Sequence, residues 1–246
     1  MRQTTIKEDN AIKAIRDIIS STETKDPMRL VRKAISDTAI SRLNKVISEC
    51  DDCQLSAPIK TIGYGNPNAS VMIIGDYPLQ AQISQSKKIL RPFEGTRNLV
   101  SLETFFSQLG VNSEELFWMN SMNCYPLMDN MYRCPNTKEI KACSVYMKYA
   151  VDIIRPAMII LVGAVALNCF KSAPMSSAHG QWIDAFTIPA MPVYSPAHIN
   201  QLEMMDNYPK EKIQTMKNDM IHDFKNAFRY LQDNFPDNNV LTKRID

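Results

Sequence analysis

Apolar residues along this chain fall into short unbroken runs, which are separated by longer stretches with the spacing of amphipathic helices. The runs lie within residues 71–74, 117–122, 158–163 and 188–193. A run this short, bounded by glycine, proline or asparagine, favours a strand covered on both faces over a helix. Strands that alternate with helices are typical of a mostly parallel sheet. The pattern therefore predicts an α/β fold, a three-layer α/β/α sandwich with a central mostly parallel sheet.

Apolar positions with helical spacing predict helices around these strands. Two of them precede the first strand, over residues 6–20 and 28–48, and Pro27 divides them. The remaining predicted helices cover residues 99–109 and 135–154, a short segment through Ala166 and Leu167, and residues 210–233.

Composition limits the class of protein but does not decide its partner. The 246 residues are 45% hydrophobic and 22% charged, which is ordinary for a globular protein. The formal charge of +2 neither requires nor excludes nucleic acid, because a phosphate-binding surface needs only a local basic patch. The N-terminus has no apolar segment of the secretory kind, so we expect a reducing, cytoplasmic location and no disulfide among the six cysteines.

An acidic residue follows the first predicted strand directly. Asp76 stands after Gly75, and in open parallel sheets ligands bind in the crevice beyond the carboxyl ends of the strands. A carboxylate held at the end of a rigid strand is a candidate catalytic group. The alternative is that Asp76 is a surface acid in a strand-to-helix loop.

The cysteines suggest a metal centre. Cys50 and Cys53 form a C-x-x-C pair outside any strand-helix-strand context, which disfavours a thioredoxin-like motif. Two thiolates this close can share one metal ion but cannot complete its site, so further ligands must come from the rest of the chain. The candidates are Cys124, Cys134 and Cys143, whereas Cys169 is expected to be a core thiol.

Taken in order, the motifs of this chain resemble those of the family 4 uracil-DNA glycosylases, the iron-sulfur branch of their superfamily. The resemblance covers roughly residues 48–230. It suggests a helical extension over residues 1–48, a glycosylase-like domain over 49–235 and a tail over 236–246. The motifs are Cys50-x-x-Cys53-x-Leu55, Gly65-Asn66-Pro67-Asn68-Ala69, Gly75-Asp76-Tyr77-Pro78, Arg91-Pro92-Phe93-Glu94-Gly95, Asn120 four residues before Cys124, Glu139 with Cys143, His179-Gly180 and Ser195-Pro196-Ala197.

The resemblance implies a 4Fe-4S cluster on four of the cysteines. The family pattern selects Cys50, Cys53, Cys124 and Cys143 as ligands and leaves Cys134 as a spare within Arg133-Cys134-Pro135. Zinc is the alternative, because four thiolates also suit a tetrahedral structural zinc site.

The resemblance also implies a role for each residue of the other motifs. Phe93 matches the aromatic ring on which the base stacks, and Asn120 matches the amide that pairs with the base edge. Asp76 matches the motif acid, usually glutamate, that positions the attacking water. Gly75 and Tyr77 flank that acid and are expected at the substrate, where the bulky Tyr77 could reject a thymine methyl group or narrow the site.

The last motif departs from the family pattern. Ser195 stands where the family usually has a histidine that donates to uracil O2, and a hydroxyl is a shorter, neutral donor. His198, three residues later, is a candidate to compensate.

The expected function is hydrolysis of the N-glycosidic bond of uracil in DNA, or of another deaminated base, by a monomeric enzyme that does not cut the strand. The alternative is a non-catalytic glycosylase-like module that binds DNA or a protein. A nucleotide-binding protein ranks below both, because the chain has no Gly-x-Gly-x-x-Gly or phosphate-loop motif.

Overall fold

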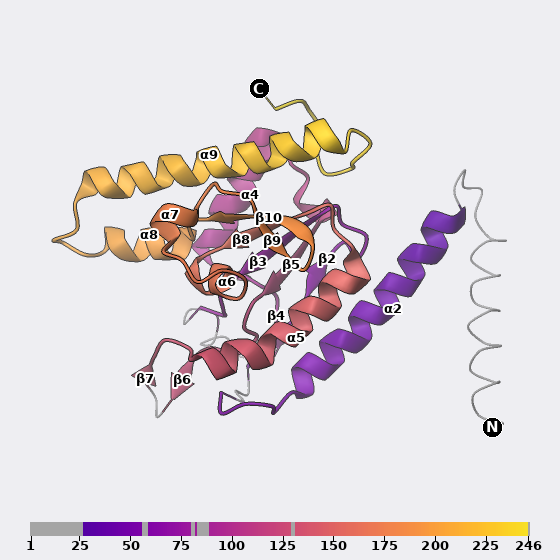
Figure 1. The fold of residues 1–246 in the computed structure, drawn as a ribbon, viewed down its shortest axis with the longest axis horizontal. Helices are drawn as coiled ribbons and strands as arrows, with labels where there is room; N and C mark the ends of the chain where they lie inside the picture. Colours follow the sequence, from indigo (N-terminus) through magenta and orange to yellow (C-terminus); the bar gives the residue numbers. More distant parts are fainter. Residues whose placement is uncertain (1–26, 56–58, 80–81, 83–88, 129–130, 246) are drawn as a thin grey trace.

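The computed structural model of the chain describes residues 27–55, 59–79, 82, 89–128 and 131–245 (Figure 1). The helix predicted over residues 6–20 lies outside them. The first described helix, α2, spans Pro27–Glu49 and so begins at the proline that was expected to divide the two helices.

A six-stranded sheet in the order β2-β5-β3-β8-β10-β9 forms the centre of the molecule. Its four inner strands run parallel, and β2 and β9 pair antiparallel at the two edges. The predicted mostly parallel sheet is therefore confirmed. The strands are β2 Tyr64–Gly65, β5 Leu116–Asn120, β3 Val71–Gly75, β8 Met158–Val162, β10 Ile188–Val193 and β9 Ile183–Ala185.

Helices cover both faces of this sheet, because successive side chains of the buried strands point to opposite sides (Figure 1). On β3, Val71 and Ile73 pack into a core with the helices α4 (Arg97–Leu109) and α9 (Lys210–Asn234). Met72 and Ile74 pack into a second core with α2 and α5 (Thr137–Ile154). The predicted three-layer sandwich is confirmed.

Short elements gather around the carboxyl ends of the inner strands. The helices α6 (Ala164–Asn168) and α8 (Pro196–Glu203) directly follow β8 and β10, and α7 (Met175–Ala178) lies between α6 and β9 in the chain. Two small sheets complete the fold. They pair β1 (Lys60–Thr61) with β4 (Ile89–Leu90), and β6 (Leu127–Met128) with β7 (Met131–Tyr132).

Both flanks of the expected domain pack against it. The buried residues Ile40, Leu43 and Ile47 of α2 belong to the same core as α5. After α9 the chain turns back, and Val240 and Ile245 are buried in the core with α4. The division at residues 48 and 235 remains a prediction. No helix in the described part of the chain combines the length and apolar character needed to span a bilayer.

Candidate functional site

The four parallel strands end in one row. The register pairs Gly75 of β3 with Asn120 of β5 on one side and with Val162 of β8 on the other, and Val162 with Val193 of β10. The motif residues that follow these strands therefore share one edge of the sheet, as expected for a site beyond the carboxyl ends.

Three of the predicted substrate-binding residues meet at this edge. A Cβ atom on Gly75 would lie 2.5 Å from Cζ of Phe93 and 2.8 Å from Oδ1 of Asn120, so only glycine leaves room for both side chains. Asn120 is 2% and Phe93 6% exposed, and the ring of Trp118 packs edge-on against Phe93 at 6.0 Å between centroids. The ring and the amide are thus both buried beside Gly75.

Phe93 adopts a strained backbone conformation. Its φ of 60° lies in the left-handed region, which typically costs a bulky residue about 1–3 kcal/mol. The turn around it is held by the Thr96 hydroxyl, which donates to the Phe93 carbonyl at 2.6 Å, and by the Arg91 N–H, which donates to Glu94 at 2.9 Å. Strain maintained in this way is typical of functional sites, and here it fixes the position of the ring.

Thr61 is a site residue that sequence reasoning missed. The Asn120 Nδ2 group donates to Thr61 Oγ1 at 3.1 Å, and Thr61 is wholly buried. An isolated threonine on a two-residue strand carries no sequence signal. Only the fold brings it to an amide 59 residues away.

The Asp76 carboxyl group lies against α6, whereas Gly75 faces Phe93. Asp76 Oδ1 accepts from the Ala166 N–H at 2.8 Å. The Cα of Gly163 lies so close to the Asp76 carboxyl that a Cβ atom at position 163 would collide with the carboxyl. Burial raises the pKa of Asp76 from 3.8 to about 7, although the backbone N–H groups of Ala166 and Val165 lower it. The carboxyl can therefore exchange a proton near neutral pH.

Tyr77 packs toward the cysteines. It lies against the buried cluster of Leu55, Met122, Cys124 and Cys143, and its ring meets that of Tyr125 edge-on at 6.5 Å. Tyr77 therefore connects the Asp76 motif with the loop that carries the cysteines.

The structure brings together the four cysteines that the family pattern selects. The pKa of Cys143 is raised to about 12, mainly by burial; a backbone hydrogen bond from Asn123 lowers it, and the nearby Cys124, Cys53 and Cys50 contribute to the rise. Cys134 is exposed and is not among these neighbours. All six cysteines lie in the described ranges, and none of them forms a disulfide.

The surroundings of these thiols fit a bound group, although no three His, Cys, Asp or Glu side chains in the described ranges have metal-binding geometry. Asn123, which precedes Cys124, is 4% exposed, and both polar atoms of its side chain are buried without a hydrogen-bond partner. Four neighbouring thiols are a possible donor set for iron or zinc. An orphaned amide beside them is the kind of group that a cluster sulfur or a water molecule satisfies.

An ion pair holds the cysteine-bearing loop onto α5. Both terminal nitrogens of Arg133 donate to Glu139, one of them at 2.9 Å, and Glu139 also forms a capping box with Asn136 at the start of the helix. The Arg133 hydrogen bond lowers the pKa of Glu139 despite burial. This anchor fixes the first turns of α5 and hence Cys143.

Ser195 and His198 occupy different surroundings. Ser195 is buried and begins α8, where its side chain makes no capping hydrogen bond. His198 is exposed and lines a cavity of about 400 Å³ together with Tyr194, Tyr208 and Asp219. None of Gly75, Asp76, Phe93 and Asn120 lines that cavity.

A histidine from the His179-Gly180 motif supports the Ser195 turn. His179 Nδ1 lies 2.8 Å from an Asp223 carboxyl oxygen, and its ring packs on Tyr194, the residue before Ser195, at 4.7 Å between centroids. Burial raises the pKa of Asp223, and the hydrogen bond from His179 opposes this shift. The pair ties α9 to the end of β10.

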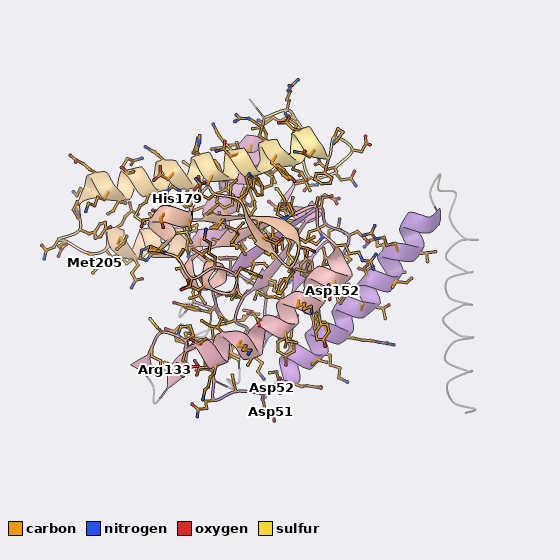
Figure 2. The ribbon with its side chains drawn as sticks, viewed as in Figure 1. Asp51, Asp52, Arg133, Asp152, His179 and Met205 are labelled. Atoms are coloured by element: carbon orange, nitrogen blue, oxygen red, sulfur yellow. The ribbon has the colours of Figure 1, made fainter. Side chains whose placement is uncertain are left out.

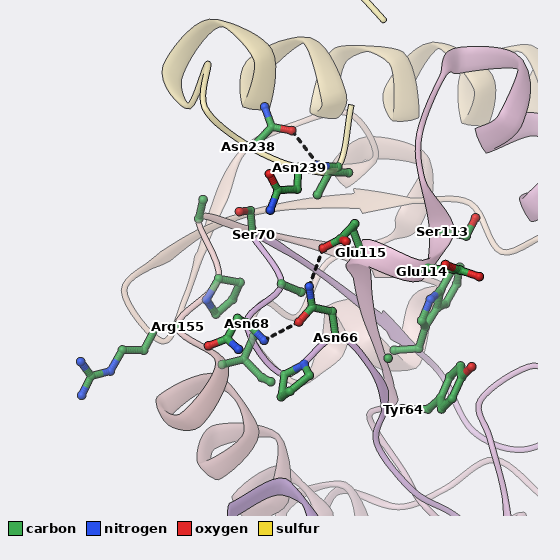
Figure 3. A pocket seen from close by; sticks show the side chains of 18 of the residues that line it. Tyr64, Asn66, Asn68, Ser70, Ser113, Glu114, Glu115, Arg155, Asn238 and Asn239 are labelled. Atoms are coloured by element: carbon green, nitrogen blue, oxygen red, sulfur yellow. Dashed lines mark hydrogen bonds between the residues drawn. The ribbon is translucent and has the colours of Figure 1, made fainter. Parts of the chain in front are cut away.

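A broader cavity lies at the opposite edge of the sheet (Figure 3). Its volume is about 1710 Å³, and its lining includes Ser70, Glu115 and Ala157, which precede β3, β5 and β8. The residues at the carboxyl ends of these strands do not line it, so size alone does not identify the candidate site.

The basic residues expected around Phe93 are only partly described. Lys87 and Lys88 lie outside the described residues. The Arg91 guanidinium lies over the Tyr64 ring at 3.9 Å, and Arg97 is exposed at the start of α4.

Comparisons with known proteins place the chain in a family. Type-4 uracil-DNA glycosylase of Pyrobaculum aerophilum is 30% identical over 129 residues, which cover 52% of this chain and 62% of that protein. The proteins of the same name from Sulfurisphaera tokodaii and Saccharolobus solfataricus are 27% and 29% identical, over 51% and 61% of this chain and 54% and 72% of their own lengths. The chain thus spans somewhat more than half of the first two relatives. A family model described as the uracil DNA glycosylase superfamily matches residues 62–225, a stretch that contains all the strand-end residues of the site, and the chain belongs to that superfamily.

Proposed function

We propose that this protein hydrolyses the N-glycosidic bond of uracil in DNA and leaves the strand uncut. The observation that carries the proposal is that Phe93 and Asn120 both lie against Gly75, at the carboxyl edge of the sheet. A stacking ring beside an amide is what recognition of an extruded base requires. The names of the relatives support the same activity.

Each part of the reaction has a candidate group. The base leaves the duplex, stacks on Phe93 and pairs with the Asn120 amide, while Asp76 holds and polarises the attacking water. Ser195 donates to uracil O2 as negative charge develops there. No lysine or cysteine occupies a matching motif position as a nucleophile, so the expected product is an abasic site in an intact strand.

We further propose that Cys50, Cys53, Cys124 and Cys143 hold a 4Fe-4S cluster, with zinc as the alternative metal. Such a cluster supplies structural cross-linking, because hydrolysis of a glycosidic bond needs no electron. Two features of the chain would position the cysteine ligands. The pair of Arg133 and Glu139 anchors the loop, and Tyr77 packs beside Cys124 and Cys143. Iron and sulfide analysis of anaerobically purified protein decides between the metals. About four irons per chain support the cluster, and stoichiometric zinc in a colourless, folded protein would exclude it.

The activity is tested with uracil-containing oligonucleotides, single-stranded and in a mispair with guanine, followed by alkaline cleavage of abasic sites. The expected result is cleavage only after alkali, and loss of most product in Asp76→Asn. The matched control is Asp152→Asn, an exposed aspartate on α5 (Figure 2). Equal inertness of wild type and Asp76→Asn on uracil and other deaminated bases would refute catalysis.

A non-catalytic module that binds DNA or a protein is the second candidate. The presence of Ser195 in place of a histidine favours it, because loss of one oxyanion donor typically costs about 2.7–4 kcal/mol of transition-state stabilisation. Salt-dependent binding to DNA without any base release would support a DNA-binding module. Binding to a protein but to no DNA would support the protein-binding form.

A further inference from the structure

The amide of Asn120 can distinguish uracil from cytosine only if its orientation is fixed. The order of its oxygen and nitrogen ends, Oδ1 and Nδ2, decides which base it can pair with. Uracil presents an acceptor at O4 and a donor at N3, whereas cytosine presents a donor at N4 and an acceptor at N3. An asparagine amide offers one acceptor and one donor end, and a half-turn of the amide exchanges them. A freely turning Asn120 would therefore pair with either base.

Thr61 gives the amide one preferred order. Asn120 Nδ2 donates to Thr61 Oγ1 at 3.1 Å, and Thr61 Oγ1 donates in turn to the Asn123 carbonyl at 3.5 Å. The same carbonyl also accepts from the Thr61 N–H at 2.8 Å, which fixes the threonine backbone. Because the hydroxyl proton is directed to Asn123, a lone pair of the hydroxyl oxygen faces Asn120.

The surroundings make the opposite order unfavourable. Thr61 is 0% and Asn120 2% exposed, so bulk water does not replace a lost partner. After a half-turn, Asn120 Oδ1 would face the lone pairs of Thr61 Oγ1. The hydroxyl would then have to give up the Asn123 carbonyl or leave two acceptors in contact. In the observed order, Oδ1 lies on the Gly75 side, and Nδ2 keeps a second hydrogen for the base.

We propose that Thr61 is a specificity-determining positioning residue, which locks the Asn120 amide in the order that accepts uracil and rejects cytosine. This inference rests on the proposed function, because it assumes that a base stacks on Phe93 and pairs with Asn120. Thr61 does not touch the reacting atoms and acts only through Asn120. Removal of the hydroxyl should therefore change selectivity more than rate.

The test compares Thr61→Val, which keeps the shape but loses the hydroxyl, with Thr61→Ser, which keeps the hydroxyl. Thr104→Val, at an exposed position on α4, is the matched control. Binding is measured with oligonucleotides carrying one 2′-fluoro-2′-deoxyuridine or 2′-fluoro-2′-deoxycytidine, which resist hydrolysis. We expect Thr61→Val to lower the uracil-to-cytosine binding ratio by roughly 10- to 100-fold, the range for an unsatisfied buried polar group. The Thr61→Ser and Thr104→Val ratios should remain within about threefold of wild type.

A second measurement does not depend on activity and is made on the wild-type protein. In a ¹⁵N-labelled wild-type protein, the Asn120 side-chain amide, assigned by its loss in Asn120→Ala, should show one proton protected from exchange with solvent. An unchanged binding ratio in folded Thr61→Val, or two Asn120 amide protons that exchange as fast as those of exposed asparagines, would overturn the inference. Failure of wild type to release uracil would instead refute the proposed function, and the amide measurement would stand.

Discussion

Replacement of Asp76 by asparagine should separate catalysis from stability. The carboxyl is enclosed between Gly163 and the first turn of α6, and burial raises its pKa from 3.8 to about 7. An asparagine has nearly the same shape, and its Oδ1 can still accept from the Ala166 N–H. The substitution therefore removes the buried charge and keeps the packing.

The sign of the stability effect follows from proton linkage. Below pH 3.8 the carboxyl is protonated in both the folded and the unfolded chain, so the charge costs no stability. As the pH rises from about 4 to about 7, the unfolded chain ionises first and the folded state loses stability. Each pKa unit corresponds to about 1.36 kcal/mol, so the full shift corresponds to about 4 kcal/mol. Because Asp76 as a whole residue is half-buried, we expect about 2–4 kcal/mol in practice.

The assay is thermal unfolding of wild type, Asp76→Asn and the control Asp152→Asn between pH 4 and pH 8. Asp76→Asn should melt roughly 5–15 °C higher than wild type at pH 8, with the difference shrinking toward zero near pH 4. The wild-type rate of uracil release should rise through about pH 7, as Asp76 ionises, and Asp76→Asn should show little activity at any pH. An Asp76→Asn protein that is less stable than wild type at pH 8, or equally stable throughout, would refute this account of the buried carboxyl.

The remaining predictions concern the cysteines, the close contact at Gly163 and the last motif. Cys143→Ser should lose iron and have a lower melting temperature than wild type. Cys134→Ser, at an exposed position, should match wild type in iron content and melting temperature. Gly163→Ala should abolish most uracil release, because its Cβ would displace the Asp76 carboxyl, with iron content as the check on folding. Ser195→His should raise the rate of uracil release by up to roughly 100-fold, and no gain would mean that backbone groups already supply the donor. His198→Ala should leave the rate within about threefold of wild type, and a large loss would place the imidazole in the site.

The layered fold could be predicted from the sequence because its strands are buried on both faces. Such strands form short continuous apolar runs, and the run at residues 71–74 corresponds to β3, Val71–Gly75. The two-residue strands β1 and β4 could not be predicted, because they have no periodicity. Their pairing depends on the surrounding chain, yet β1 is the strand that carries Thr61.

The sequence also indicated which residues would share the carboxyl edge, since parallel strands end at the same side of a sheet. It could not indicate the direction of each side chain there. The motif places Gly75 and Asp76 next to each other, but Gly75 faces Phe93 and Asp76 faces α6. Nor did it indicate that Tyr77 packs beside Cys124 and Cys143, and its expected place at the base remains a prediction.

Hydrogen bonds connect the cysteine loop with Asn120, so loss of the proposed cluster should affect base selection as well as the stability of the fold. Asn123 donates its backbone N–H toward Cys143, and its carbonyl accepts from both polar groups of Thr61, which in turn accepts from Asn120. A displacement of the loop at Asn123 would release the Thr61 hydroxyl and with it the order of the Asn120 amide. The Asp76 carboxyl is held separately, by α6. Partial loss of the metal should therefore impair the choice between uracil and cytosine before it impairs hydrolysis.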